Sequence, residues 1–146
     1  MTMKSIDILV AEDNEDDVVL IREAFAEGKL ANRITIVRDG VEALAYLRGE
    51  GGYRDAPLPG IVLLDINMPR KSGFEVLMEA KADLKLRAVP IVMLTVSERE
   101  EDIVRSFSEG ACSYVRKPVT LNRFVAVIKE FELYWTLVSK VPAMSR

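Results

Sequence analysis

The chain has 146 residues, with 20 lysines and arginines against 23 aspartates and glutamates, and a formal net charge of −3. We expect this length to form one domain that spans residues 1–146, without a second folded output domain. The acidic balance excludes a protein that binds nucleic acid through bulk positive charge. The sequence contains no histidine and one cysteine, Cys112, which excludes histidine-dependent catalysis, histidine-ligated zinc and an internal disulfide.

The apolar stretches are interrupted by charge well before the roughly 18 residues that suggest a membrane span. The amino terminus runs directly into a strand pattern. We therefore expect a soluble, cytoplasmic protein that does not associate with a membrane.

Apolar, β-branched runs alternate with helical patterns along the whole chain. In chain order the sequence predicts strand 6–11, helix 16–25, strand 34–37, helix 41–47, strand 61–64, a helix beginning over 73–78, strand 89–94, a helix through 103–107, strand 113–116 and a last helix over about 121–138. Asn14 is placed to cap the first helix, and Ser97 with Glu100 has the spacing of a capping box ahead of the fourth. The connection 50–60 is long enough to carry recognition, but a solvated connector explains it equally well.

Strands that alternate with helices through short connections predict right-handed βαβ crossovers. The expected fold class is therefore α/β. We expect a (βα)5, doubly wound, flavodoxin-like domain in which a parallel five-stranded sheet carries helices on both faces.

Acidic residues close the first and third of these strands. Glu12 and Asp13 follow strand 6–11, and Asp65 follows strand 61–64. Because parallel α/β sheets place their ligand sites beyond the carboxyl ends of the strands, we expect the three acids to share one small volume. Carboxylates that lie so near to one another need a shared cation or an added proton. Mg²⁺, which prefers oxygen ligands, is the expected cation.

Thr95 follows the fourth strand, and Lys117 follows the fifth and precedes Pro118. These residues and the three acids, in this order on a (βα)5 pattern, closely resemble the receiver domain of two-component response regulators. The resemblance covers a core of about residues 6–128. It implies a single-domain signalling protein whose only chemistry is its own phosphorylation and dephosphorylation, with a histidine on a partner kinase as the phosphoryl donor.

The resemblance and the chemistry of phosphoryl transfer imply a role for each residue at the strand ends. Asp65 is the nucleophile that forms an aspartyl phosphate. Glu12, Asp13, Asp65 and the backbone carbonyl of Asn67 are expected to hold Mg²⁺. The ammonium of Lys117 is expected to contact a phosphoryl oxygen as a point charge.

The remaining implied roles concern switching. Thr95 is expected to donate its hydroxyl to the phosphoryl group, and Tyr114 to swing inward when Thr95 moves. This movement would reshape the face formed by the fourth helix, the fifth strand and the fifth helix, by biasing an existing two-state equilibrium. Asn67 and Ser97 occupy positions that tune dephosphorylation in receivers.

The last helix has more apolar residues than one small domain needs to cover. One stripe is expected to dock on the sheet, while other apolar residues point elsewhere or fold back on the domain. The predicted dimer or partner face consists of Val127, Phe131, Tyr134, Trp135, Leu137 and Val138. Together with the long Gly51-Gly52-Tyr53 loop, this helix resembles that of stand-alone receivers, which commonly form homodimers through the last helix and receive phosphoryl groups from phytochrome-type histidine kinases, the bacteriophytochromes.

The sequence leaves two other functions open. A Mg²⁺-dependent phosphohydrolase that uses an aspartyl phosphate shares the nucleophile, the metal and the lysine. Such haloacid-dehalogenase-like enzymes usually carry an aspartate two residues after the nucleophile, where this chain has Asn67. A phosphate-independent interaction module with a silent site is the other alternative.

Overall fold

The computed structural model describes residues 7–27, 33–96, 105, 108–111, 113–117, 120, 122 and 126. Its elements are β1 (Ile8–Ala11), α1 (Glu15–Glu27), β2 (Ile34–Val37), α2 (Gly40–Arg48), the 3-10 helix η1 (Gly51–Tyr53), β3 (Ile61–Asp65), α3 (Gly73–Ala82), β4 (Ile91–Thr95) and β5 (Ser113–Arg116). Of the predicted fourth and fifth helices, only the single residues 105, 108, 122 and 126 are described, and each is helical. The predicted capping box at Ser97 and Glu100 lies outside the described residues.

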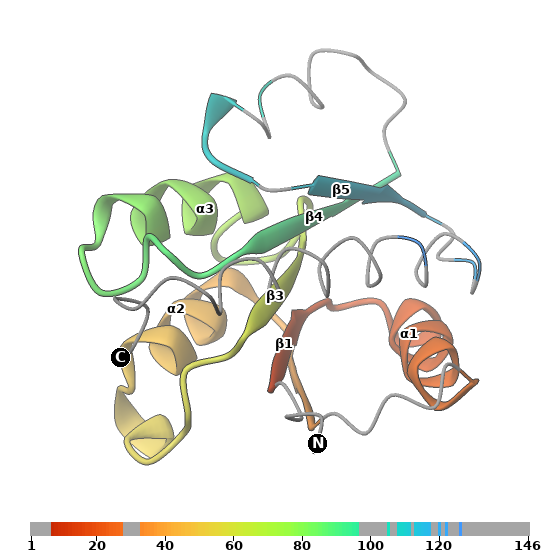
Figure 1. The fold of residues 1–146 in the computed structure, drawn as a ribbon, viewed down its shortest axis with the longest axis horizontal. Coiled ribbons are helices and arrows are strands. Elements are labelled where there is room, and N and C mark those ends of the chain that lie inside the picture. Colours follow the sequence, from red (N-terminus) through yellow and green to blue (C-terminus); the bar gives the residue numbers. More distant parts are fainter. Residues whose placement is uncertain are drawn as a thin grey trace, which may run out of the picture.

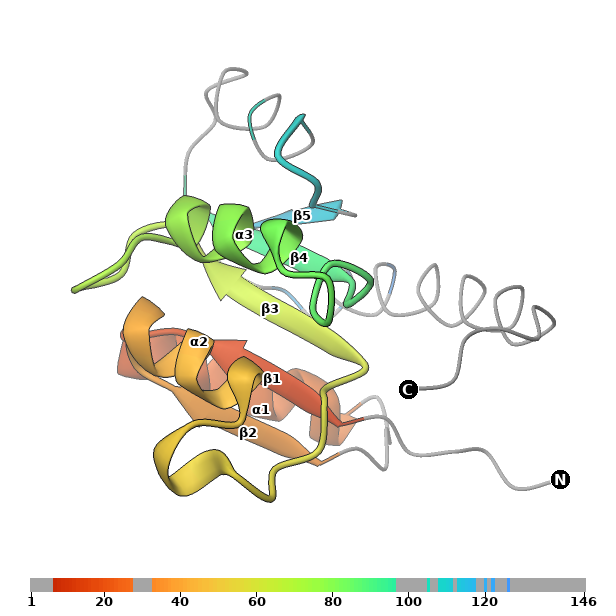
Figure 2. The same cartoon turned by 90° about the vertical axis from the view of Figure 1, so that its left-hand side faces the viewer.

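The five strands form one parallel sheet in the order β2-β1-β3-β4-β5. Figure 1 shows α2 and α3 on one face of this sheet and α1 on the opposite face. Figure 2, turned by a quarter, shows α2 and α3 side by side in front of the strands. This arrangement confirms the predicted α/β class and its doubly wound parallel sheet.

The central strands are buried on both faces, as expected where helices cover both sides of a parallel sheet. All residues of β1 and β3 are buried. Alternate residues point to opposite faces. Leu9, Val62 and Met93 belong to the core cluster that contains the apolar residues of α2 and α3. Their strand neighbours Val10 and Leu63 are equally buried but lie outside that cluster, on the face that α1 covers.

The boundaries of two elements differ from the prediction for local reasons. β4 begins at Ile91 rather than at residue 89, because Pro90 has no N–H to donate and the N–H of Val89 donates to the carbonyl of Leu86 at 2.9 Å. α2 begins at Gly40, because the Asp39 side chain caps it by accepting the N–H of Glu42 at 2.7 Å. The predicted cap of α1 is present, since Asn14 Oδ1 accepts the N–H of Asp17 at 3.1 Å.

The connection 50–60 is folded onto the domain. Its 3-10 turn places the Tyr53 ring against Tyr46, with ring centroids 5.1 Å apart, and the Tyr53 hydroxyl donates to Glu42 at 2.7 Å. Ala56 and Leu58 pack against the core, although they are only partly buried. Tyr53, Ala56 and Leu58 therefore hold the connection on the domain, while Glu50, Gly51, Gly52, Arg54, Asp55 and Pro57 are exposed to solvent.

In the part of the chain that the structure describes, no helix combines the length and the apolar character needed to cross a bilayer.

Candidate functional site

The strand register brings the predicted site residues to one edge of the sheet. Ala11 is paired with Leu64, so the residue after β1, Glu12, lies in the same row as Asp65. Asp65 is paired in turn with Leu94, the residue before Thr95. On the next strand Thr95 is paired with Arg116, the residue before Lys117. Parallel pairing thus places residues that are far apart in sequence at one carboxyl edge.

Three carboxylates meet at this edge. Glu12, Asp13 and Asp65 each offer an oxygen, and these oxygens lie within 4.8 Å of one another. Glu12 and Asp65 are buried, whereas Asp13 is exposed. The first helix is capped by Asn14 rather than by Asp13, which leaves the Asp13 carboxylate with the cluster. The cluster predicted from the sequence therefore forms in the fold.

The ammonium of Lys117 is the positive charge of the site. Its Nζ lies 2.5 Å from Glu12 Oε1, 3.0 Å from Asp17 Oδ2 and 3.2 Å from Asp65 Oδ2. The Lys117 side chain is only 8% exposed, so these ion pairs are largely shielded from water. An ammonium has three N–H donors, which matches these three carboxylates in number.

Burial and neighbouring charges shift the pKa values of Glu12 and Lys117. Burial, together with the neighbouring Asp65, raises the pKa of Glu12 to about 7, even though Lys117 and the N–H of Asn14 favour its charged form. Burial alone would lower the pKa of Lys117. The carboxylates of Glu12, Asp65 and Asp17 outweigh that effect and raise it above the ordinary lysine value, so the ammonium stays charged.

The donor set fits a hard divalent cation. Carboxylate oxygens are the ligands that Mg²⁺ prefers, and the cluster brings three carboxylates together at the carboxyl edge of the sheet. Glu12 Oε1 faces Lys117, and Glu12 Oε2 lies 3.2 Å from the N–H of Asn14. The Asp65 oxygens likewise face Lys117 and the N–H of Asn67, so the exposed Asp13 carboxylate is the most open of the three to a metal, with Asp65 and Glu12 beside it.

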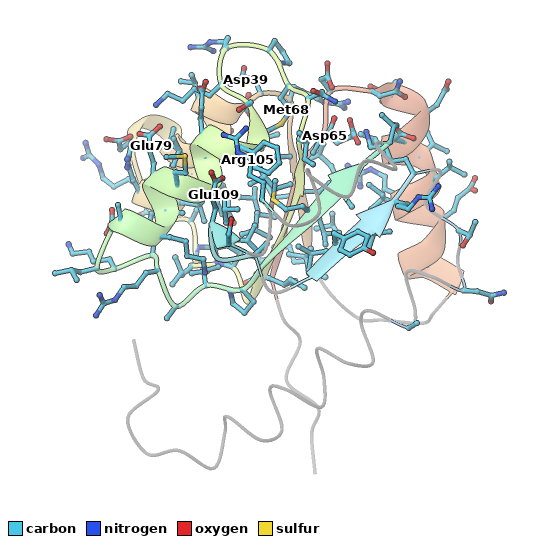
Figure 3. All side chains as sticks on the ribbon, turned by 90° about the horizontal axis from the view of Figure 1, so that it is seen from above. Asp39, Asp65, Met68, Glu79, Arg105 and Glu109 are labelled. Carbon is cyan, nitrogen blue, oxygen red and sulfur yellow. The ribbon has the colours of Figure 1, made fainter. Side chains whose placement is uncertain are left out.

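The loop that follows Asp65 is fixed to the start of α2. Asp65 Oδ1 accepts the N–H of Asn67 at 3.3 Å. Arg70 adopts a left-handed backbone with φ of 69°, and its guanidinium lies 3.2 Å from Asp39 Oδ2. A Cβ at Gly40 would lie 2.3 Å from the Lys71 carbonyl oxygen, so loop and helix are in close contact. Figure 3 shows Asp65, Met68 and Asp39 at the same edge of the molecule.

Comparison with known proteins agrees with this geometry. The family model for the response regulator receiver domain matches residues 8–129. The chain belongs to this family.

Three known proteins are similar to this chain over most of its length. Response regulator Rcp1 of Synechocystis sp. is 34% identical over 136 residues, which cover 93% of this chain and 92% of Rcp1. The probable methanogenesis regulatory protein FilR2 of Methanothrix harundinacea is 41% identical over 129 residues, covering 88% of this chain and 82% of FilR2. The phosphorylated cyanobacterial phytochrome response regulator RcpA is 40% identical with a TM-score of 0.79, covering 91% of this chain and 95% of RcpA.

A crystal structure of Rcp1 in its Mn²⁺-bound form also matches this receiver, with a TM-score of 0.77 and 34% identity over 89% of this chain and 94% of that one. The acidic cluster and this metal-bound relative agree on a divalent-cation site in the family. Rcp1 is named as a response regulator and RcpA as a phytochrome response regulator, which agrees with the subgroup that the sequence resembles.

The structure describes some of the other predicted site residues but not all of them. Asn67 is exposed beside Asp65, and Tyr114 lies half-buried on β5, where it packs against the core. Thr95 ends β4, but its side chain is outside what the structure describes. Ser97 and the whole predicted dimer face of the last helix also lie outside the described residues. Their roles stay predictions.

The sequence reasoning missed Asp17. It belongs to the first turn of α1 and contacts Lys117, yet it was treated only as part of a helix. No local signal in the sequence pointed to this contact. Asp17 lies four residues after Asp13, but α1 begins only at Glu15, so helical spacing does not relate the two side chains.

Proposed function

We propose that Asp65 accepts a phosphoryl group from a phosphohistidine of a sensor histidine kinase, with Mg²⁺ at the acidic cluster. One observation carries this proposal. Asp65 Oδ2 lies 3.2 Å from the buried ammonium of Lys117, and the same carboxylate shares the cluster of Glu12 and Asp13. Because the chain contains no histidine, the donor imidazole belongs to another molecule.

In the proposed transfer, a carboxylate oxygen of Asp65 forms a bond to phosphorus as the P–N bond of the phosphohistidine breaks. The imidazole nitrogen leaves with the electron pair and takes up a proton. Lys117 supplies positive charge to the phosphoryl oxygens without giving up a proton. Mg²⁺, when bound, adds positive charge at the same oxygens. Water later cleaves the acyl phosphate and restores the carboxylate, so the receiver processes no metabolite.

The proposed output is a change in the face formed by the fourth helix, β5 and the fifth helix. A phosphoryl group that engages Thr95 would bias the position of Tyr114 on β5. The described residues also contain a series of contacts that connects Arg105 with the backbone of Asp65. The guanidinium of Arg105 lies 4.1 Å over the ring of Phe74. Phe74 follows Gly73, which packs directly on the backbone of Asp65.

The proposed upstream partner is a phytochrome-type histidine kinase. The support is similarity to RcpA, a phytochrome response regulator, and to Rcp1. We further propose a homodimer through the last helix, supported by the apolar face predicted there from the sequence. The proposed setting is the cytoplasm, and the proposed unit is a single receiver domain.

The test is intact mass after incubation with a small phosphodonor such as phosphoramidate, with and without Mg²⁺. We expect a gain of one phosphoryl group that requires Mg²⁺ and is abolished by Asp65→Asn. Asp55→Asn is the matched control, since Asp55 is an exposed aspartate in the 50–60 connection, and this variant should gain the group like the unmodified protein. No gain with any donor would leave a phosphate-independent interaction module as the better description.

A further inference from the structure

Asp17 is a fourth carboxylate at the site, in addition to Glu12, Asp13 and Asp65. Its Oδ2 lies 3.0 Å from Lys117 Nζ, a shorter distance than the 3.2 Å between that ammonium and Asp65. The Asp17 side chain is 17% exposed and that of Lys117 is 8% exposed. The contact is therefore a partly shielded ion pair rather than one of the exposed surface pairs that contribute little.

Asp17 differs from Glu12 and Asp65, the other two partners of Lys117, in its other neighbours. Glu12 and Asp65 both belong to the acidic cluster, where their oxygens would help to hold a cation and an Asp65 oxygen would carry the phosphoryl group. Asp17 does not belong to that cluster. Its contact with the ammonium thus remains available when the other two carboxylates are engaged.

The backbone of Asp17 is held in place by the start of α1. Its N–H donates to Asn14 Oδ1 at 3.1 Å, and the next residue, Val18, donates its N–H to the Asn14 carbonyl at 3.1 Å. Val18 is buried under the sheet. A carboxylate on a capped and packed helical turn is a firm anchor for a lysine, whose four-carbon stem is flexible.

We propose that Asp17 is a positioning residue that holds the Lys117 ammonium beside Asp65 for phosphoryl transfer. This inference rests on the proposed phosphoacceptor role of Asp65. Loss of the anchor would let the ammonium take up other positions, and small displacements of a charge from a developing phosphoryl transition state are costly. Asn at this position keeps an oxygen that accepts a hydrogen bond from the ammonium, whereas Ala removes the contact.

The experiment compares Asp17→Ala, Asp17→Asn and Asp16→Ala. Asp16 is the matched control, because it is an exposed aspartate in the same helical turn, it is not among the carboxylates that contact Lys117, and its loss removes the same charge. The maximal rate of phosphoryl gain and the donor concentration at half-maximal rate are measured by intact mass with phosphoramidate at saturating Mg²⁺. Thermal unfolding midpoints of all variants are measured in parallel.

We expect Asp17→Ala to lower the maximal rate about tenfold, within the roughly hundredfold loss that a 1 Å misplacement causes. Asp17→Asn should retain an intermediate rate, the half-maximal donor concentration should stay unchanged, and Asp16→Ala should match the unmodified protein. A purely structural role would lower the unfolding midpoint without this graded loss of rate.

Equal or faster rates in Asp17→Ala than in Asp16→Ala would overturn the inference, because Asp17 would then act as bulk charge or as a competitor for Lys117. If Asp17→Ala does not fold, the pair Asp17→Asn and Asp16→Asn decides, with a slower Asp17→Asn supporting the inference and equal rates overturning it. Failure of the unmodified protein to gain a phosphoryl group would instead overturn the proposed function, together with this role.

Discussion

At the scale of single residues, Gly73 fixes the backbone that carries the phosphoacceptor. A Cβ built on Gly73 would lie 2.3 Å from the Asp65 carbonyl oxygen and 2.9 Å from the Ile66 Cα. The N–H of Gly73 also donates to the Ile66 carbonyl at 2.8 Å. Because these atoms belong to the backbone of a buried strand end, they cannot move aside as a flexible side chain would. The start of α3 and the end of β3 are therefore in direct contact.

Gly73→Ala is expected to destabilise the fold by about 1–3 kcal/mol, since overpacking forces backbone shifts, and to slow phosphoryl gain at Asp65. Urea unfolding and the intact-mass rate measure the two effects. Gly52→Ala is the control, because a Cβ there meets nothing within 4 Å. An unfolding free energy that is the same for both variants would show that the α3 start is less constrained than its contacts indicate.

At the scale of elements, the 50–60 connection is held on α2 by Tyr53. The hydrogen bond to Glu42, with a smaller effect of burial, raises the pKa of Tyr53 to about 12. The folded state therefore holds the phenolic proton more tightly than the unfolded chain, whose tyrosine pKa is about 10. This contribution to stability is fully present below about pH 10 and is lost as the pH rises toward 12.

Tyr53→Phe is expected to cost about 1 kcal/mol near neutral pH, through loss of the hydrogen bond. It should also remove part of the alkaline loss of stability. The measurement is the free energy of unfolding in urea across the alkaline range, for the variant and for the unmodified protein. The difference between the two should shrink between about pH 10 and pH 12, and a constant difference would contradict the assigned pKa.

The elements also show what the sequence could and could not predict. The strands and the Asn14 cap follow from local patterns, and the acidic cluster follows from the rule that parallel strands end at one edge. The packing of Tyr53 and the contact between Asp17 and Lys117 depend on how α2 and α1 lie on the sheet. Periodicity gives the face of a helix but not the partner that its first turn meets, so these contacts had no local signal strong enough to predict them.

At the scale of the whole molecule, the account predicts a dimer through the last helix. Light scattering after size exclusion should give a mass of twice 16.4 kDa. Trp135→Glu should give a monomer, because a charge is costly in the apolar centre of an interface. Leu84→Glu is the control, since Leu84 is 76% exposed after α3, and it should leave the mass unchanged. A monomeric unmodified protein, or a dimer that only Leu84→Glu disrupts, would contradict the predicted face.

The charges gathered at the sheet edge support Asp65 as the phosphoacceptor. The most direct measurement is reductive trapping, in which borohydride converts an aspartyl phosphate to homoserine and peptide mass spectrometry locates the changed residue. After phosphorylation with Mg²⁺, the account predicts homoserine at Asp65 and at no other acid of the site. Homoserine at Asp13 or Asp17, or no homoserine in a protein that has gained phosphoryl mass, would contradict it.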